Sequence, residues 1–351
     1  MRRAARRAIV ALVLPATTAV LATSGALFLA RSPFQGWAGD AIVVELPSGS
    51  SARAILATLE RKGVVRSRLL ADAAYRILFR GRTLKAGEYR FQGPRSTVDI
   101  LRDLVEGNVV TYRLTIPEGL TAAEIFDLLE GERLATREEL EGLFRQPGLF
   151  PGVPEGAPTL EGFLGPDTHL FTRSQRPREI VATLVSAFRR SLPPRFSQRA
   201  AELGRTPLEA VTLASLVEKE TGVAAERPLV SAVYHNRLKV GMPLQCDPTV
   251  VYALRRRGLF TGVLGHEGLS VDDPYNTYVH GGLPPGPVAS PGAAALEAAV
   301  APAAVPYLYF VAAGDGSGGH RFAVTYDEHL ANVALYRRAR AARETESAAA
   351  R

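Results

Sequence analysis

The pattern of apolar and polar positions changes along the chain. Residues 8–30 contain no charged residue. In later segments the apolar residues recur either at every second position or at intervals of three and four positions. A spacing of two is typical of strands with one buried face, and a spacing of three and four is typical of amphipathic helices. The pattern predicts an N-terminal transmembrane helix, then small α+β modules, then a mixed α/β domain, so the fold class is α+β.

The uncharged segment is long enough to cross a bilayer. At about 1.5 Å per residue, residues 8–30 cover the roughly 30 Å hydrocarbon layer. Residues 1–7 are then a cytoplasmic tail, because this tail holds Arg2, Arg3, Arg6 and Arg7. We expect a single-pass anchor in the plasma (inner) membrane with the rest of the chain exported. The alternative is a signal peptide cleaved near Ala22–Ala26.

Residues 41–133 carry an internal repeat. A strand, a turn and a helix are predicted for 41–63, followed by a helix near 66–80 and a returning strand at 83–91. Six residue types recur at an offset of 70 positions, since Pro47, Gly49, Ala52, Ile55, Leu59 and Glu60 correspond to Pro117, Gly119, Ala122, Ile125, Leu129 and Glu130. Such units resemble LysM modules, which hold N-acetylated glycans. The alternative is a duplicated spacer that binds nothing.

A hinge and a second domain follow. Residues 134–160 contain a short helix and a Pro/Gly-rich stretch, which predicts a linker. The second domain is expected over 161–340, with helices at 176–192 and 293–300 and a hairpin with a Gly-rich turn after residue 306. Residues 341–351 are expected to form a frayed tail.

One helix of the second domain carries an unusual acid. Thr206, Pro207 and Glu209 predict its start through a capping box with proline at the first helical position. A stripe of apolar residues at helical spacing then faces the core, formed by Ala210, Leu213, Leu216 and Val217. Glu220 occupies the next position on that stripe.

Burial gives Glu220 the property of a general acid. A desolvated carboxyl has a raised pKa and holds a proton near neutral pH. Glu218 projects from roughly the opposite side of the helix, so the two acids do not form a dyad. The alternative is a structural ion pair between Glu220 and Arg227 or Arg237.

Other candidates follow that helix. Glu226 lies in the first turn of a helix predicted over 224–240, where a negative charge suits the dipole. Asp247 is expected to cap the next helix, with Pro248 at its first position. The loop at 271–292 is rich in proline and glycine and also holds Tyr275, Asn276, Thr277 and Tyr278. Its Tyr and Asn side chains could stack on and hydrogen-bond a sugar. The alternative is a surface loop packed on the core.

Composition narrows the function classes. The chain has 351 residues and a net charge of +7, but four of the positive charges lie in the N-terminal tail, and no basic run with interleaved aromatics occurs. Nucleic-acid binding is therefore not expected. The six histidines have no metal-ligand spacing, so no metal or other cofactor is expected. No serine or cysteine nucleophile motif appears, and Cys246 is interpreted as helix-cap packing.

Five motifs in fixed order resemble the MltG (YceG-like) family of membrane-anchored endolytic murein transglycosylases. They are 161-EGFLGPDTHLF-171, 213-LASLVEKETGVAAER-227, 235-HNRLKVGMPLQCDPTVVYAL-254, 274-PYNTYVHGGLPPGPVASPG-292 and 306-PYLYFVA-312. Cys246 departs from the usual Ser or Thr, and Ser290 from the common Asn.

The resemblance implies a lytic transglycosylase that cleaves the MurNAc–GlcNAc bond of nascent glycan and terminates chain elongation. The second acid of the Glu-Lys-Glu-Thr motif, Glu220, would be the catalytic residue. Supporting or substrate-binding candidates are Glu218, Lys219, Glu226, Gln245, Asp247, Tyr275, Asn276 and Thr277. The partners implied are peptidoglycan strands, the membrane and cell-wall synthases. The rival interpretations are a non-catalytic, membrane-tethered glycan-binding scaffold and a hydrolase of the same bond.

Overall fold

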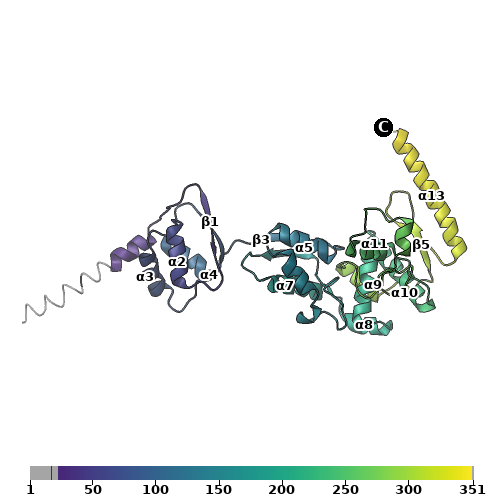
Figure 1. Ribbon diagram of the computed structural model, residues 1–351, viewed down its shortest axis with the longest axis horizontal. Coiled ribbons are helices and arrows are strands. Elements are labelled where there is room, and N and C mark those ends of the chain that lie inside the picture. Colours follow the sequence, from purple (N-terminus) through teal and green to yellow (C-terminus); the bar gives the residue numbers. More distant parts are fainter. Residues whose placement is uncertain (1–16, 18–22, 350–351) are drawn as a thin grey trace, which may run out of the picture. The chain divides into compact units, whose positions relative to one another are not determined.

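The computed structural model of the chain describes residue 17 and residues 23–349 (Figure 1). The chain divides into two compact units: unit 1 is Met1–Tyr112 with Leu170–Gln175, and unit 2 is Arg113–His169 with Arg176–Arg351. The described part contains many helices and three sheets of two strands each. This confirms the α+β class.

The predicted membrane span falls largely outside the described residues. Residues 23–31 form a short helical segment, and its Ala30 is buried in the core of unit 1. Among the residues that the structure describes, no helix is both long and apolar enough to cross a bilayer. The anchor over 8–30 therefore stays a prediction.

Unit 1 is built on an antiparallel strand pair. Ala41 lies opposite Gln92, and Leu46 lies opposite Gly87. Because alternate residues face the helices, Val44, Leu46, Tyr89 and Phe91 are buried. The element order is β1 (Ala41–Leu46), α2 (Ala52–Arg61), α3 (Arg68–Leu78), β2 (Gly87–Gln92) and α4 (Thr97–Glu106).

The internal repeat is confirmed as two strand–turn–helix units. The first copy is β1–α2, and the second is β3 (Tyr112–Ile116) followed by α5 (Ala122–Gly131). Gly49 and Gly119 both have positive φ, at 80° and 76°, which glycine adopts without strain. Ser51 and Thr121 then cap their helices by accepting a bond from the backbone three residues on.

The two copies belong to different units. The sequence predicts one region over 41–133 and a hinge at 134–160. In the structure the boundary between the two compact units lies at residue 112 instead. The second copy is held within unit 2, because the Gly119 N–H donates to the Ser290 carbonyl at 2.8 Å and the Ser290 N–H donates to the Leu120 carbonyl at 2.8 Å.

Unit 2 is organised around helix α9 (Pro207–Glu220), which packs against four other helices, α8, α10, α11 and α12 (Figure 1). Its remaining elements, with the strand β4 that borders it, are α6 (Arg137–Phe144), η1 (Pro147–Leu149), β4 (Asp167–Phe171), α7 (Pro177–Ser191), α8 (Phe196–Glu202), η2 (Ala224–Glu226), α10 (Arg227–Val240), α11 (Asp247–Arg256), η3 (His266–Ser270), α12 (Ala293–Val300), β5 (Tyr309–Ala312), β6 (His320–Ala323) and α13 (Tyr326–Ala349).

The C-terminal part follows the predicted hairpin and differs in the tail. Strands β5 and β6 pair antiparallel around a Gly-rich turn, as expected. The helix after them, however, continues through Ala349, so the tail expected to fray from residue 341 is helical as far as the structure describes it. Its residues are mainly Ala, Arg and Glu, which have high helix propensity.

Candidate active site

Helix α9 begins as its sequence predicts. The Thr206 hydroxyl accepts a hydrogen bond from the Glu209 N–H at 3.2 Å, and the Glu209 carboxylate accepts one from the Thr206 N–H at 2.7 Å. Every residue from 210 to 217 is buried, so this stretch of the helix has no solvent face. The predicted apolar stripe is therefore part of a helix buried on all sides, and the half-buried Glu220 ends that helix.

Two neutral groups bond the same oxygen of Glu220. The phenol of Tyr234, on α10, donates to Oε1 at 2.8 Å. The thiol of Cys246, the residue that precedes α11, donates to the same Oε1 at 3.1 Å. Within the described residues no hydrogen bond or ion pair reaches Oε2, so a proton on this carboxyl sits on Oε2.

The surroundings favour a protonated Glu220. Burial raises the pKa of this carboxyl, the bonds from Cys246 and Tyr234 act against that shift, and the charge of Asp247 adds to it. Burial also raises the pKa values of Tyr234 and Cys246 well above their ordinary range. Both groups therefore keep their protons and act as donors.

The expected alternative, an ion pair at Glu220, is wrong. Arg227 lies 3.9 Å from Glu218 instead. Arg237 donates to backbone carbonyls, including those of Leu308 and Leu244, each at 2.7 Å. Neither cation neutralises Glu220 in the described part of the chain.

Glu218 has separate partners. Its Oε2 accepts a hydrogen bond from the Gly292 N–H, at the start of α12, at 3.0 Å. Burial raises its pKa as well, and the charge of Glu118 raises it further. Lys219 is exposed and donates to the Gly119 carbonyl at 3.0 Å. Glu218 and Lys219 therefore hold the second repeat copy and α12 against the end of α9.

Glu226 does not cap a helix with its side chain, which corrects the prediction. It precedes α10 without a side-chain capping bond. Its Oε2 lies 2.8 Å from His320 Nδ1, and its Oε1 accepts from the His320 N–H at 2.9 Å. The bonds between Glu226 and His320 tether β6 to the start of α10. The His320 imidazole is also near enough to Glu220 for its charge to lower the pKa of that acid.

Three loop residues expected to meet a sugar are buried. The Asn276 amide donates to the carbonyls of Leu269 at 3.0 Å and Val271 at 2.8 Å. Thr277 accepts from the Cys246 N–H at 3.0 Å. Tyr275 is only 4% exposed. The loop at 271–292 thus folds back on itself and positions Cys246, and the direct sugar contacts predicted for these side chains are wrong.

Gln245 and Asp247, on either side of Cys246 in the chain, are exposed candidates. Gln245 has φ of 49°, an uncommon conformation for a residue with a side chain, and its N–H donates to the Thr277 carbonyl at 3.2 Å. Asp247 is the first residue of α11 rather than its cap, and its Oδ1 accepts from the Tyr278 phenol at 2.6 Å. Gln245 and Asp247 flank Cys246 in the chain. Their side chains and the Tyr278 phenol remain able to contact a ligand.

Sequence reasoning missed a second buried acid, Glu161. It is 3% exposed, and burial raises its pKa to about 7. Its Oε1 accepts from the Ala122 N–H at 2.9 Å, and Tyr252 also bonds this carboxyl. Glu161 therefore fixes the start of α5, since a carboxyl suits the N-terminus of a helix. Tyr234 was missed because only the apolar residues of α10 were considered.

The described residues include no group of three or more His, Cys, Asp or Glu side chains that could hold a metal ion. The site so far is one half-buried glutamate held by two neutral donors at the end of a buried helix. These features make Glu220 the candidate for single-carboxyl acid–base chemistry in an α+β protein.

Comparison with known proteins places the chain in a family. The model of the YceG-like family matches residues 44–335, so the chain belongs to that family. A crystal structure of a YceG-like protein from Listeria monocytogenes is 30% identical, with a TM-score of 0.52, and the similarity covers 83% of this chain and 99% of that one.

Curated relatives carry one name. The chain is 31% identical over 322 residues to the endolytic murein transglycosylase of Streptococcus pneumoniae strain D39, covering 84% of this chain and 58% of the relative. It is 28% identical over 289 residues to the endolytic murein transglycosylase of Bacillus subtilis, covering 78% and 79%. The chain therefore spans little more than half the length of the streptococcal relative.

Proposed function

We propose that this chain is an endolytic murein transglycosylase that cleaves the MurNAc–GlcNAc bond and leaves 1,6-anhydro-MurNAc ends. The observation that carries the proposal is Glu220, a desolvated acid whose Oε1 accepts two hydrogen bonds while its Oε2 has no described partner. The names of the family relatives support the same activity.

One carboxyl can perform both proton transfers of this reaction. Protonated Glu220 first gives its proton to the glycosidic oxygen, and the substrate's own N-acetyl group relieves the positive charge at the anomeric carbon. The carboxylate then takes the proton of the MurNAc C6 hydroxyl, whose oxygen closes the 1,6-anhydro ring. No water is consumed, so the products differ from those of a hydrolase.

The hydrogen bonds to Oε1 suit this cycle. Because Tyr234 and Cys246 stabilise the carboxylate that forms after the first transfer, they limit the cost of creating a charge in a buried position. Gln245 and Asp247 are the exposed side chains nearest in sequence to Cys246, and we assign them to the glycan. Glu218, Lys219, Asn276 and Thr277 position the site without meeting the substrate.

The proposal includes a location and partners. Residues 8–30 would anchor the chain in the plasma membrane with unit 2 on the exported side, where it would meet nascent strands made by cell-wall synthases and end their elongation. The repeat resembles LysM modules, and its first copy, in unit 1, would hold the glycan.

Product analysis separates this activity from its rivals. Purified murein sacculi are incubated with the full chain in detergent, and the masses of the soluble fragments are measured by mass spectrometry. A transglycosylase gives 1,6-anhydro-MurNAc ends, a hydrolase gives reducing MurNAc ends that are one water heavier, and a glycan-binding scaffold releases no fragments. Either of the last two results would refute the proposal.

A further inference from the structure

Unit 2 contains a cavity that shares none of the residues bonded to Glu220. Its volume is about 590 Å³, which lies within the usual range for ligand sites. It lies between α5, α6 and α11, and it is lined by Thr121, Ala122, Ala123, Glu124, Phe126, Arg137, Glu141, Phe144, Arg145, Thr159, Glu161, Tyr252, Arg255 and Arg256.

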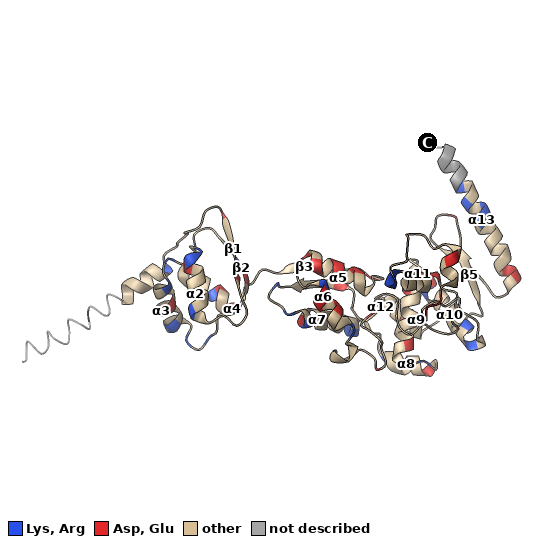
Figure 2. Cartoon of the chain, in the orientation of Figure 1, with Lys and Arg blue, Asp and Glu red and all other residues tan. Residues whose placement is uncertain are grey.

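The lining combines an apolar floor with charges of both signs. Phe126 and Phe144 meet edge to face with ring centroids 5.9 Å apart. Figure 2 shows acidic positions on α5 and α6 and basic positions on α11. An apolar surface bordered by both carboxylates and guanidinium groups suits a short peptide with ionised groups rather than a purely apolar or purely anionic ligand.

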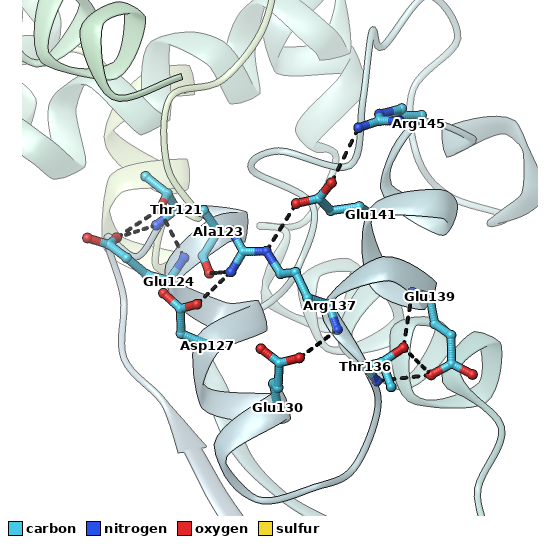
Figure 3. A network of polar contacts seen from close by, with 10 residues as sticks. All are labelled: Thr121, Ala123, Glu124, Asp127, Glu130, Thr136, Arg137, Glu139, Glu141 and Arg145. Carbon is cyan, nitrogen blue, oxygen red and sulfur yellow. Dashed lines mark hydrogen bonds and ion pairs between the residues drawn. The ribbon is translucent and has the colours of Figure 1, made fainter. Parts of the chain in front are cut away.

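The guanidinium groups of the cavity are not held equally. Arg137 is fixed by Asp127 at 2.5 Å, by Glu141 at 3.1 Å and by the Ala123 carbonyl at 3.1 Å (Figure 3). Arg145 has only a 3.3 Å contact with Glu141, and its side chain is 73% exposed. Arg145 therefore loses little when it turns to a carboxylate of a ligand.

Helix α11 connects the cavity to the acid. Cys246, directly before its first turn, bonds Glu220, while Tyr252, Arg255 and Arg256 line the cavity. Arg255 lies nine positions after Cys246, which corresponds to about 13–14 Å along the helix. An extended peptide advances about 3.3–3.6 Å per residue, so roughly four residues cover that length.

We propose that this cavity binds the peptide stem of the glycan strand, a short peptide with free carboxylates that is joined by an amide to the lactyl group of MurNAc. The inference rests on the proposed function, since that substrate carries such a stem. Arg145 takes a stem carboxylate, and the aromatic floor takes the apolar side chains.

The test compares two substrates and two variants. Full-length protein in detergent is given glycan strands that retain their stems, or the same strands stripped of stems by an amidase. Arg145→Glu reverses the charge of the least firmly held arginine of the cavity. Ala123→Trp fills the cavity from an exposed position on α5. The matched control is Arg190→Glu on α7, an exposed residue 3.7 Å from Asp167 that does not line the cavity.

We expect Arg145→Glu and Ala123→Trp to lower kcat/KM about tenfold on stem-bearing strands, as the loss of one charge-assisted contact predicts. On stripped strands we expect kcat/KM of both variants to stay within about twofold of the wild type. The control should stay within about twofold of the wild type on both substrates. Equal losses on both substrates, or no loss on stem-bearing strands, would refute the cavity as a stem site.

A binding measurement separates this inference from the proposed function. If wild-type protein releases no anhydro products from either substrate, the proposed function fails. Calorimetry with a free stem tetrapeptide then decides about the cavity alone: binding that Arg145→Glu weakens about tenfold supports it, and absence of binding to the wild type overturns it.

Discussion

The phenol of Tyr234 donates a hydrogen bond of 2.8 Å to Oε1 of Glu220, and this contact sets the properties of the proposed acid. Tyr234 lies on α10 and Glu220 ends α9, so the packing of these two helices fixes the contact. The donor stabilises the ionised form of the carboxyl, while burial stabilises the neutral form.

Tyr234→Phe removes that donor and should raise the pKa of Glu220 further. The first step needs the protonated acid, so kcat falls as pH rises through this pKa. The alkaline limb of the kcat profile therefore moves to higher pH in the variant. The maximal kcat should drop about tenfold, because the carboxylate formed in the reaction loses one hydrogen bond. A pH profile with an unmoved alkaline limb would show that the Tyr234 bond does not act on the acid.

Cys246 tests the same oxygen from α11. Cys246→Ser keeps a donor and should retain at least half of the wild-type kcat. Cys246→Ala removes the donor and should move the alkaline limb in the same direction as Tyr234→Phe. Measuring both variants at equal thermal stability separates loss of the bond from loss of packing, and similar kcat profiles for Ser and Ala would contradict the assignment.

Asn276 should behave as a structural residue. It is fully buried and both of its amide hydrogens bond loop carbonyls, so Asn276→Ala should cost about 2–3 kcal/mol of stability. Gln245→Asn is the comparison, because Gln245 is exposed and asparagine tolerates its positive φ. We expect thermal melting to show a lower Tm only for Asn276→Ala, and kinetics to show a raised KM only for Gln245→Asn. The reverse pattern would show that Asn276 contacts the substrate.

Glu161 should make stability depend on pH. Its pKa is about 7 in the folded chain and 4.5 by its ordinary value, so the folded state binds more protons between these limits. Stability from this group is complete below pH 4.5 and is lost as pH rises to about 7, on the order of 3 kcal/mol in all.

Glu161→Gln should remove that slope, because the amide oxygen still accepts the bond from the Ala122 N–H. Urea unfolding at several pH values between 4.5 and 8 measures the slope directly. An unchanged slope in the variant would mean that Glu161 does not titrate in this range.

The local signals of helix α9 were readable from the sequence. Thr206, Pro207 and Glu209 are consecutive or nearly so, and their capping geometry depends on the backbone of one turn. Glu220 was selected as a desolvated acid, and burial does raise its pKa. The apolar stripe is only part of the buried surface, since residues 210–217 of α9 are buried on every side, and only the packing of α8, α10, α11 and α12 shows that.

The partners of Glu220 could not be predicted in this way. Tyr234 and Cys246 come from elements separated from α9 by loops, and their convergence depends on tertiary packing. The sequence does not reveal the role of Asn276, because a polar loop side chain that bonds its own loop carbonyls looks the same in sequence as one that contacts a sugar. The two repeat copies looked like one region because sequence similarity does not show which core a copy joins.

In the proposed reaction Glu220 is the acid and base, whereas Glu218 holds α12 through the Gly292 N–H. Glu220→Gln and Glu218→Gln are compared in the full-length protein, since both keep side-chain volume and remove ionisation. The release of 1,6-anhydro fragments from murein sacculi is measured by mass spectrometry. We expect Glu220→Gln to lose about 10²–10⁴-fold in rate with an unchanged fold, while Glu218→Gln keeps part of the activity. A Glu220→Gln protein that turns over at near the wild-type rate would contradict the assignment.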